Sequence, residues 1–237
     1  MFRYFSRFIL NTALFTFIVT LSLVVLFRFV HPPFTTFMVI KKIQKGFFKY
    51  TINYQWVDLK EISQQAAFAV VASEDQRFFE HWGIDVTAIT KAFKRNQKSR
   101  KRLGGSTLTQ QTAKNLFCWP SRTYFRKAVE GYFSLLLETV WGKRRILETY
   151  LNIVELGPDV FGVEEASHHY FGHGAKSLTR EEAALLAAIL PNPIRYDAHS
   201  PSDYIRQRQT QIVWQMQMLE CRSEVKKLFK LSGEKGR

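Results

Sequence analysis

Apolar side chains are concentrated at the start of the chain, in one uninterrupted stretch. Phe8 to Phe27 are 20 consecutive uncharged residues, mostly Phe, Leu, Val, Ile and Thr. As a helix rising about 1.5 Å per residue, the stretch spans the roughly 30 Å hydrocarbon core of a bilayer. A cleaved signal peptide has a shorter apolar region followed by small residues, whereas Arg28 follows here. Core helices of soluble proteins rarely stay apolar this long, so the pattern predicts a transmembrane helix.

The segment after this anchor mixes apolar and basic residues. Pro32 and Pro33 prevent the anchor helix from continuing. The mixture suits a membrane surface, and it equally suits a domain that buries its own aromatics and exposes its lysines. Both interpretations stay open. The apolar members are Phe34, Phe37, Met38, Val39, Ile40, Ile43, Phe47 and Phe48, and the basic members are Lys41, Lys42, Lys45 and Lys49.

Helical spacing of apolar residues dominates the rest of the chain. It recurs over 61–73, 107–117, 123–140 and 144–153. Thr179 with Glu182 forms a capping box before an apolar run that Pro191 stops, and a last helix starts near Ser202. No strand-rich segment is convincing. The sequence predicts a mainly α protein with a tip and anchor at 1–30, a connector at 31–54 and one compact domain at 55–237.

Charge indicates an anionic partner. Lys and Arg outnumber Asp and Glu by 34 to 20, a formal net charge of +14. A membrane anchor argues against nucleic acid, so anionic lipid or a phosphorylated substrate is the expected partner. Arg3 and Arg7 favour a cytoplasmic N-terminus, although cations also follow the anchor. Seven cations lie between 91 and 102, and we expect them on a membrane-facing loop: Lys91, Lys94, Arg95, Lys98, Arg100, Lys101 and Arg102.

Metal-binding patterns are weak in this sequence. Cys118 and Cys221 are its cysteines, without C-x-x-C or Cys/His ligand spacing, so a zinc site is not expected. Whether the two form a disulfide is left open. His168, His169 and His173 lie close in sequence but lack the H-E-x-x-H arrangement, and we interpret them as ordinary packing or surface residues.

The first segment with candidate chemistry runs from Glu74 to Gly83, with the sequence EDQRFFEHWG. A helical continuation of the apolar run before it would place Glu74, Phe78 and His81 on one face, and Gly83 could end that helix. A carboxylate beside aromatics at the end of an apolar helix loses solvation, which raises its pKa and suits a general base. Alone, the segment fits a capping or salt-bridged glutamate equally well.

A glycine pair opens the second segment, Gly104 to Asn115, with the sequence GGSTLTQQTAKN. The glycines permit close approach of the backbone, Ser106 can cap the following helix, and free amides at its start attract phosphate oxygens. Gln110 and Lys114 then share a helix face. A flexible linker leading into a polar helix is the alternative.

The third segment, Arg122 to Glu130, places cations around a carboxylate. Arg126 and Lys127 precede Glu130 by four and three residues, so a helix puts all three on one side. An exposed ion pair is the ordinary interpretation. The functional one is a carboxylate held among cations that bind a diphosphate.

Together these segments resemble the peptidoglycan glycosyltransferase family, the lysozyme-like enzymes that polymerise lipid II. The patterns E-D-x-x-F-x-x-H-x-G, G-x-S-T-x-T-Q-Q-x-x-K-N and R-K-x-x-E occur in order from Glu74, Gly104 and Arg126. A fourth set follows over 146–172, and the resemblance covers roughly residues 55 to 200. It implies a lysozyme-like domain with a small membrane-facing lobe beside the cleft, preceded by one transmembrane helix.

The resemblance also implies roles. Glu74 matches the general base that deprotonates the 4-hydroxyl of the acceptor sugar, and Glu130 matches the second catalytic carboxylate. The expected reaction joins sugars by β-1,4 links with inversion and releases undecaprenyl diphosphate. No cofactor is required, and it is left open whether Mg or Mn assists at the diphosphate. The expected substrate-binding residues are Asp75, Phe78, His81, Ser106, Thr107, Gln110, Gln111, Lys114, Arg122, Arg126 and Lys127.

The expected partners are lipid II, the growing lipid-linked glycan and membrane lipids, with other cell wall synthesis proteins left open. The expected location is the bacterial inner membrane, crossed once, with the domain on the outer side. We expect a monofunctional enzyme, because S-x-x-K at Ser223 to Lys226 lacks the other transpeptidase motifs. One alternative is a lytic enzyme that cleaves glycan, which the cations from Lys114 to Lys127 disfavour because a glycan strand has no diphosphate to bind. The other is a non-catalytic scaffold, which the presence of both Glu74 and Glu130 disfavours.

Overall fold

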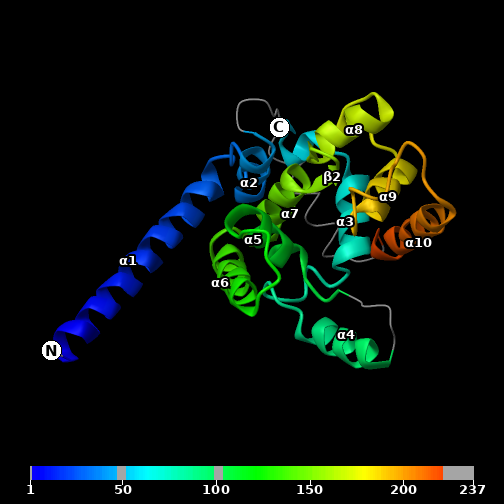
Figure 1. The fold of residues 1–237 in the computed structure, drawn as a ribbon. Helices are drawn as coiled ribbons and strands as arrows, with labels where there is room; N and C mark the ends of the chain where they lie inside the picture. Colours follow the sequence, from blue (N-terminus) through cyan, green and yellow to red (C-terminus); the bar gives the residue numbers. More distant parts are fainter. Residues whose placement is uncertain (1, 47–51, 99–103, 221–237) are drawn as a thin grey trace, which may run out of the picture.

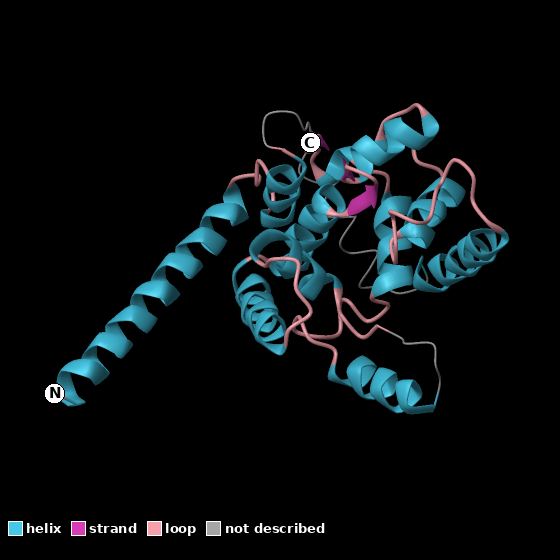
Figure 2. Ribbon diagram, viewed as in Figure 1, coloured by secondary structure: helices cyan, strands magenta, loops and turns pink. Residues whose placement is uncertain are grey.

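The computed structural model describes residues 2–46, 52–98 and 104–220, and helices dominate it (Figures 1 and 2). The prediction of a mainly α fold is confirmed. The helices are α1 (Phe2–Phe29), α2 (Thr36–Lys45), α3 (Gln64–Glu74), α4 (Val86–Lys98), α5 (Leu108–Phe117), α6 (Tyr124–Val140), α7 (Gly142–Ile153), α8 (Val163–Phe171), α9 (Arg180–Ile189) and α10 (Asp203–Glu220), with short 3-10 turns at Leu59–Glu61 and Ala175–Ser177.

The predicted anchor is the long helix α1, which projects from the domain with its N-terminus far from the other helices (Figure 1). It is the one helix in the described part of the chain that is long and apolar enough to cross a membrane. Its last turns are bonded to the junction of α6 and α7. Trp141 Nε1 donates to the carbonyl of Val24 at 2.7 Å, and Arg145 Nη2 donates to that of Phe27 at 2.9 Å. These bonds fix the anchor to the domain.

The connector after the anchor combines features of both interpretations. Helix α2 buries Met38, while Phe34 and Ile43 are exposed. Lys41 bonds the carboxylate of Glu155, and Lys45 bonds that of Asp159 at 2.6 Å, so these lysines attach α2 to the domain. Phe47, Phe48 and Lys49 lie outside the described residues.

Helix α3 lies at the centre of the core. Every residue from Ala66 to Ala72 is buried, which fits packing against helices on more than one side. Helix α3 packs against the alanine-rich helix α9, and small side chains allow two helix backbones to approach closely. Helices α10 and α7 also contact α3. The last residue of α3, Glu74, is therefore carried by a rigid element.

A small sheet accompanies the helices. Strands β1 (Asn53–Tyr54), β2 (Glu155–Gly157) and β3 (Val160–Phe161) pair in the order β1-β3-β2. β1 pairs in parallel and β2 antiparallel with β3. The sequence did not predict this sheet, because strands of two or three residues are too short to show alternation.

The basic run begins on a helix, so the expectation of a loop was wrong for residues 91–98. Asp85 accepts a bond from the amide of Ala88 at 2.9 Å and so caps the start of α4. Val86, Ile89 and Phe93 follow at helical spacing and are exposed. Figure 1 shows α4 at the edge of the molecule, apart from the other helices. Arg100, Lys101 and Arg102 lie outside the described residues.

Candidate active site

The structure ends helix α3 at Glu74, so the predicted continuation through Phe78 and His81 was wrong. Asp75 leaves the helix with φ −157° and ψ 71°. Its carboxylate accepts a bond from the amide of Leu108, at the start of α5, at 3.0 Å, and lies 2.9 Å from His81 Nε2. These tertiary bonds pull the chain out of the helix and turn it back toward α5.

Glu74 itself is held by residues from distant parts of the chain. Gln111 Nε2 of α5 donates to Glu74 Oε2 at 2.8 Å, and the hydroxyl of Tyr150 donates to Gln111 Oε1 at 3.2 Å. Arg208 Nη2 of α10 lies 3.8 Å from Glu74 Oε1. The amide and the cation orient both carboxylate oxygens.

Burial raises the pKa of Glu74 above that of an ordinary glutamate. The bond from Gln111 and the charges of Arg208 and Lys114 oppose this effect, while the charge of Asp75 adds to it. The predicted direction is confirmed. A carboxylate whose pKa lies closer to neutrality is a stronger base than an exposed one.

Three residues predicted to bind substrate are buried and help to support the site, and one of them, Asp75, also lines the cleft beside Glu74. Phe78 is fully buried, and Asp75 and His81 bond each other with less than a tenth of their surface exposed. Lys143 Nζ lies 4.6 Å from the centre of the Phe78 ring and donates to the carbonyl of His81 at 2.6 Å. These contacts anchor the turn that follows Glu74.

Thr107 caps the start of α5, so the prediction that Ser106 caps this helix was wrong. Thr107 Oγ1 accepts from the amide of Gln110, and Gln110 Oε1 accepts from the amide of Thr107, each at 3.1 Å. Gln110 is buried in this capping box. With the amide of Leu108 bonded to Asp75, these amides are occupied, so the predicted phosphate site at free amides is wrong for them.

The carboxylate of Glu130 is surrounded by cations, as the spacing on α6 predicted. Arg126 Nη1 donates to Glu130 Oε2 at 2.6 Å, and Lys127 bonds the other oxygen. Lys127 Nζ also donates to Ser106 Oγ at 3.0 Å, which brings the glycine-rich segment to this cluster. Arg126 Nε is buried and has no hydrogen-bond partner among the described residues.

Lys114 connects the two carboxylates electrostatically. It lies on α5, close enough to Glu74 and to Glu130 for both charges to affect its pKa. Burial lowers the pKa of Lys114, and the neighbouring Arg126 and Lys127 lower it further, whereas the carboxylates oppose them. A half-buried ammonium that shares its site with other cations gains from an anionic ligand. Arg122, the remaining predicted cation, is exposed just before α6.

A cleft of about 210 Å³ opens between the end of α3, helix α4 and the segment from Gly104 to Thr107. Glu74 and Ser106 line it, so the predicted base and one edge of the cation cluster share one cavity. The sequence did not predict that Arg77, Asp85 and Lys91 line this cleft, or that Arg208 lies beside Glu74. The basic run in the sequence was a signal for Lys91, but no motif or charge pattern near Arg208 indicated its role.

Comparison with known proteins shows the family of the chain. The sequence model of the family described as "Transglycosylase" matches residues 40–217, most of the chain. The chain belongs to the transglycosylase family. It is 51% identical over 218 residues to the biosynthetic peptidoglycan transglycosylase of Pasteurella multocida, covering 91% of this chain and 89% of the relative. The protein of the same name from Cronobacter sakazakii is 52% identical, with 83% of each chain covered.

Membership of this family shows the general activity of the protein. Its relatives carry a name from peptidoglycan synthesis, including that of Shewanella oneidensis at 50% identity over 83% of this chain. The enzyme is a peptidoglycan glycosyltransferase of cell wall biogenesis, and the resemblance found in its motifs is confirmed. The transglycosylase domain is lysozyme-like, as the resemblance implied.

Proposed function

We propose that this enzyme polymerises lipid II into β-1,4-linked glycan with inversion and releases undecaprenyl diphosphate. The observation that carries the proposal is the pairing of a half-buried glutamate of raised pKa, Glu74, with the cation cluster around Glu130. When a hydroxyl attacks a glycosyl diphosphate, the enzyme needs a base that takes the proton and a site that holds the departing anion.

Glu74 acts as the general base. Its carboxylate takes the proton of the acceptor's 4-hydroxyl as that oxygen bonds to the anomeric carbon of the donor. The bond between the anomeric carbon and the diphosphate oxygen breaks, and the electron pair leaves with the diphosphate. Attack opposite an α-linked leaving group gives the β link. Gln111 holds Glu74 toward the cleft while leaving the second oxygen, near Arg208, to receive the proton.

Lys114, Arg126 and Lys127 hold the departing diphosphate, with Arg122 at the exposed edge. Negative charge grows on the leaving group in the transition state, and cations already in place stabilise it without rearranging. Glu130 keeps Arg126 and Lys127 oriented. Its two oxygens are occupied by them, so we propose that these cations, and not a resident Mg or Mn ion, meet the charge of the diphosphate. Ser106 lines the cleft beside the cluster, and Gln111 acts through its bond to Glu74.

Asp75, Phe78 and His81 act by position. Asp75 directly follows the base and accepts a bond from the amide of Leu108, the first residue of α5, and α5 carries both Gln111 and Lys114. The pair of Asp75 and His81 thereby sets the distance between the base and the diphosphate site. Thr107 and Gln110 fix the same helix start.

The enzyme crosses the bacterial inner membrane once, with the catalytic domain on the outer side. Arg3 and Arg7 at the free end of α1 support a cytoplasmic N-terminus. Lipid II and the growing glycan then reach the cleft from the membrane in which α1 is embedded, and membrane lipids are its neighbours.

Lipid II polymerisation by the purified full chain in detergent tests the proposal. The parent enzyme should form glycan and release undecaprenyl diphosphate, and it should leave finished glycan strands intact. Cleavage of finished glycan without polymerisation of lipid II would favour the lytic alternative. Polymerisation by an enzyme carrying Glu74→Gln at the parent rate would place the base elsewhere.

A further inference from the structure

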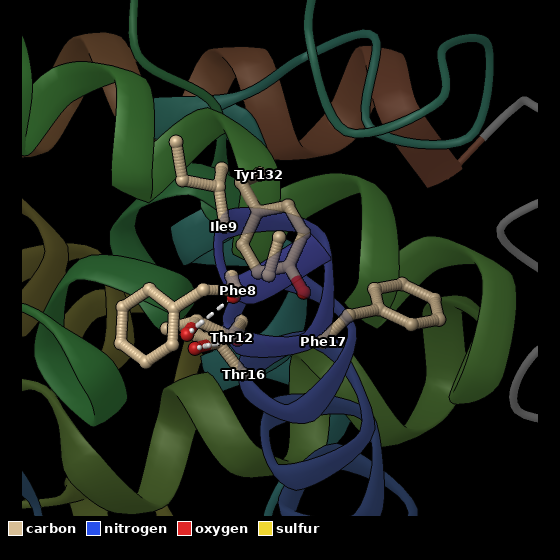
Figure 3. Close-up of a pocket in the computed structure, with 7 residues that line it drawn as sticks. Phe8, Ile9, Thr12, Thr16, Phe17 and Tyr132 are labelled. Carbon is tan, nitrogen blue, oxygen red and sulfur yellow. Dashed lines mark hydrogen bonds between the residues drawn. The ribbon is translucent and has the colours of Figure 1, made fainter. Parts of the chain in front are cut away.

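Helix α6 presents different residues to the membrane helix and to the site. On one side Tyr132, together with residues of α1, lines a groove of about 530 Å³ (Figure 3). The opposite side carries Glu130 and, eight residues later, Glu138, whose side chain is only 4% exposed. Burying a carboxylate costs solvation, and the proposed function assigns Glu138 no role.

One oxygen of Glu138 joins three helices. Its Oε1 accepts a bond from Thr109 Oγ1 of α5 at 2.6 Å and another from Lys143 Nζ of α7 at 2.7 Å. Thr109 is fully buried. Because hydrogen bonds to a charged oxygen are short and strong, this one atom fixes α5 and α7 relative to α6.

Lys143 extends this junction to the turn that follows the base. Its ammonium donates to the carbonyl of His81 at 2.6 Å and lies 4.6 Å from the centre of the Phe78 ring. An ammonium has three donors. The carboxylate of Glu138, the carbonyl and the ring face account for all three. Lys143 is therefore part of the framework and not a group that is available to substrate.

The turn also packs directly on α6. A Cβ at Gly83 would lie 3.0 Å from Glu138 Cγ and 3.2 Å from the carbonyl oxygen of Ser134. Even a methyl group would force one of these neighbours to move. The turn and α6 are thus in close contact at the level of Glu138.

These contacts reach the base through α5. Thr109 precedes Gln111 by two residues on this helix. Gln111 Nε2 is the donor that holds Glu74 Oε2 at 2.8 Å. Glu138 and Lys143 therefore join the turn after the base to the helix that orients the base.

We propose that Glu138 and Lys143 are a positioning pair that keeps Gln111 within bonding distance of Glu74 during catalysis. The inference rests on the proposed function, in which Glu74 is the base. Apolar residues can often replace a largely buried ion pair without loss of stability, so stability alone is a weak explanation for such a pair. A fixed geometry is the stronger one, since a displacement of about 1 Å at a catalytic group can lower the rate about 10²-fold.

Carbon-13 titration of the Glu74 carboxyl, in the full chain in detergent, tests the pair without turnover, and Glu74→Gln assigns the signal. The bond from Gln111 lowers the pKa of Glu74. That bond should weaken in Lys143→Met, so the midpoint should rise by roughly one pH unit. The other ionisable groups close to Glu74 are unchanged in this variant: Asp75, Lys114, Tyr150 and Arg208.

Glu138→Gln separates position from direct electrostatics, because it removes a charge of the opposite sign and keeps the side-chain shape. A direct effect of charge on Glu74 would raise the midpoint in Lys143→Met and lower it in Glu138→Gln. Loss of position raises the midpoint in both. For lipid II polymerisation, kcat should fall roughly 10- to 100-fold in each variant, with KM within about twofold of the parent value.

Lys41→Met is the matched control. It breaks the ion pair of Lys41 with Glu155, which joins α2 to β2. The Lys41 side chain is 18% exposed, against 20% for Lys143, so the two variants remove lysines of similar burial. The control should leave the Glu74 midpoint and kcat near the parent values.

Thr109→Val removes only the hydroxyl that bonds Glu138, and it decides the question where Lys143→Met does not fold. It should raise the midpoint, and Thr109→Ser should restore it. Midpoints that stay at the parent value, that move in opposite directions in the two charge variants, or that move equally in Lys41→Met would overturn the inference. Parental polymerisation by Glu74→Gln would instead refute the proposed function, and the titration of the carboxyl would still report its contacts.

Discussion

Replacing Arg208 by Met removes the cation that lies 3.8 Å from the base, Glu74. At that separation the attraction is about 1 kcal/mol at the dielectric constant of water and about 4 kcal/mol at an effective value of 20. The Arg208 and Glu74 side chains are 27% and 17% exposed, so solvent weakens the attraction, and about 1 to 2 kcal/mol is the reasonable expectation.

The sign of the effect follows from the role of Glu74. A general base works when deprotonated, so kcat/KM rises with pH through the pKa of that base in the free enzyme. Arg208 lowers the pKa of Glu74, and its removal raises that pKa further above the ordinary value. The rising limb should therefore move to higher pH by about one pH unit.

The assay is the initial rate of lipid II polymerisation at low substrate concentration across pH. Arg206→Met, on the exposed side of the same helix, removes an equal charge and should leave the limb in place. The position of the limb distinguishes this effect from a simple loss of substrate binding, which lowers the rate at every pH. A limb that stays fixed in Arg208→Met, or moves to lower pH, would refute the reasoning.

Further predictions concern the base, the anion site and the turn after Glu74. Glu74→Gln should lower turnover by roughly 10²- to 10⁴-fold and abolish the rising limb, while lipid II still binds. Lys114→Met should weaken binding of undecaprenyl diphosphate by about 1.5 to 3 kcal/mol, measured by calorimetry. Asp75→Ala should lower the free energy of unfolding by about 3 kcal/mol, because it leaves His81 and the amide of Leu108 unpaired. Gly83→Ala should destabilise by about 1 to 3 kcal/mol, since φ is +75° and a Cβ would lie 3.0 Å from Glu138 Cγ.

Each of these outcomes can fail separately. Parental turnover in Glu74→Gln contradicts its role as base, and unchanged affinity in Lys114→Met removes it from the diphosphate site. Denaturant unfolding of Asp75→Ala at the parent midpoint would show that its bonds do not stabilise the turn. For Gly83→Ala, a denaturant midpoint equal to that of the parent would show that the turn accommodates the added Cβ, which contradicts the predicted destabilisation.

Local signals in the sequence predicted most of the helices. Thr179 and Glu182 form their capping box as expected, because a cap depends on residues within one turn. The ion pairs of Glu130 with Arg126 and Lys127 followed from helical spacing alone. Helix α4 was missed because its charge concealed the spacing of Val86, Ile89 and Phe93.

Tertiary contacts account for what the sequence could not supply. The end of α3 is set by Asp75 bonding to Leu108, a partner in a different helix, so local propensity favoured the wrong continuation. Arg208 reaches Glu74 only because α10 packs on α3. The family patterns identified which residues gather at the site, while the packing decided that Phe78 and His81 support it from behind.

The attachment of α1 has a consequence for how freely the anchor can vary. Trp141 and Arg145 donate to main-chain carbonyls of Val24 and Phe27, and Arg145 also reaches that of Val30. Such bonds recognise a helical backbone whatever its side chains, so substitutions at these three positions leave the acceptors in place. A deletion of one residue after Val30 would instead leave the helix intact and change how the chain enters α2. These bonds thus constrain the length of chain between the anchor and the domain, while side-chain identity on α1 is constrained where the helix packs on the domain, as at the fully buried Val24.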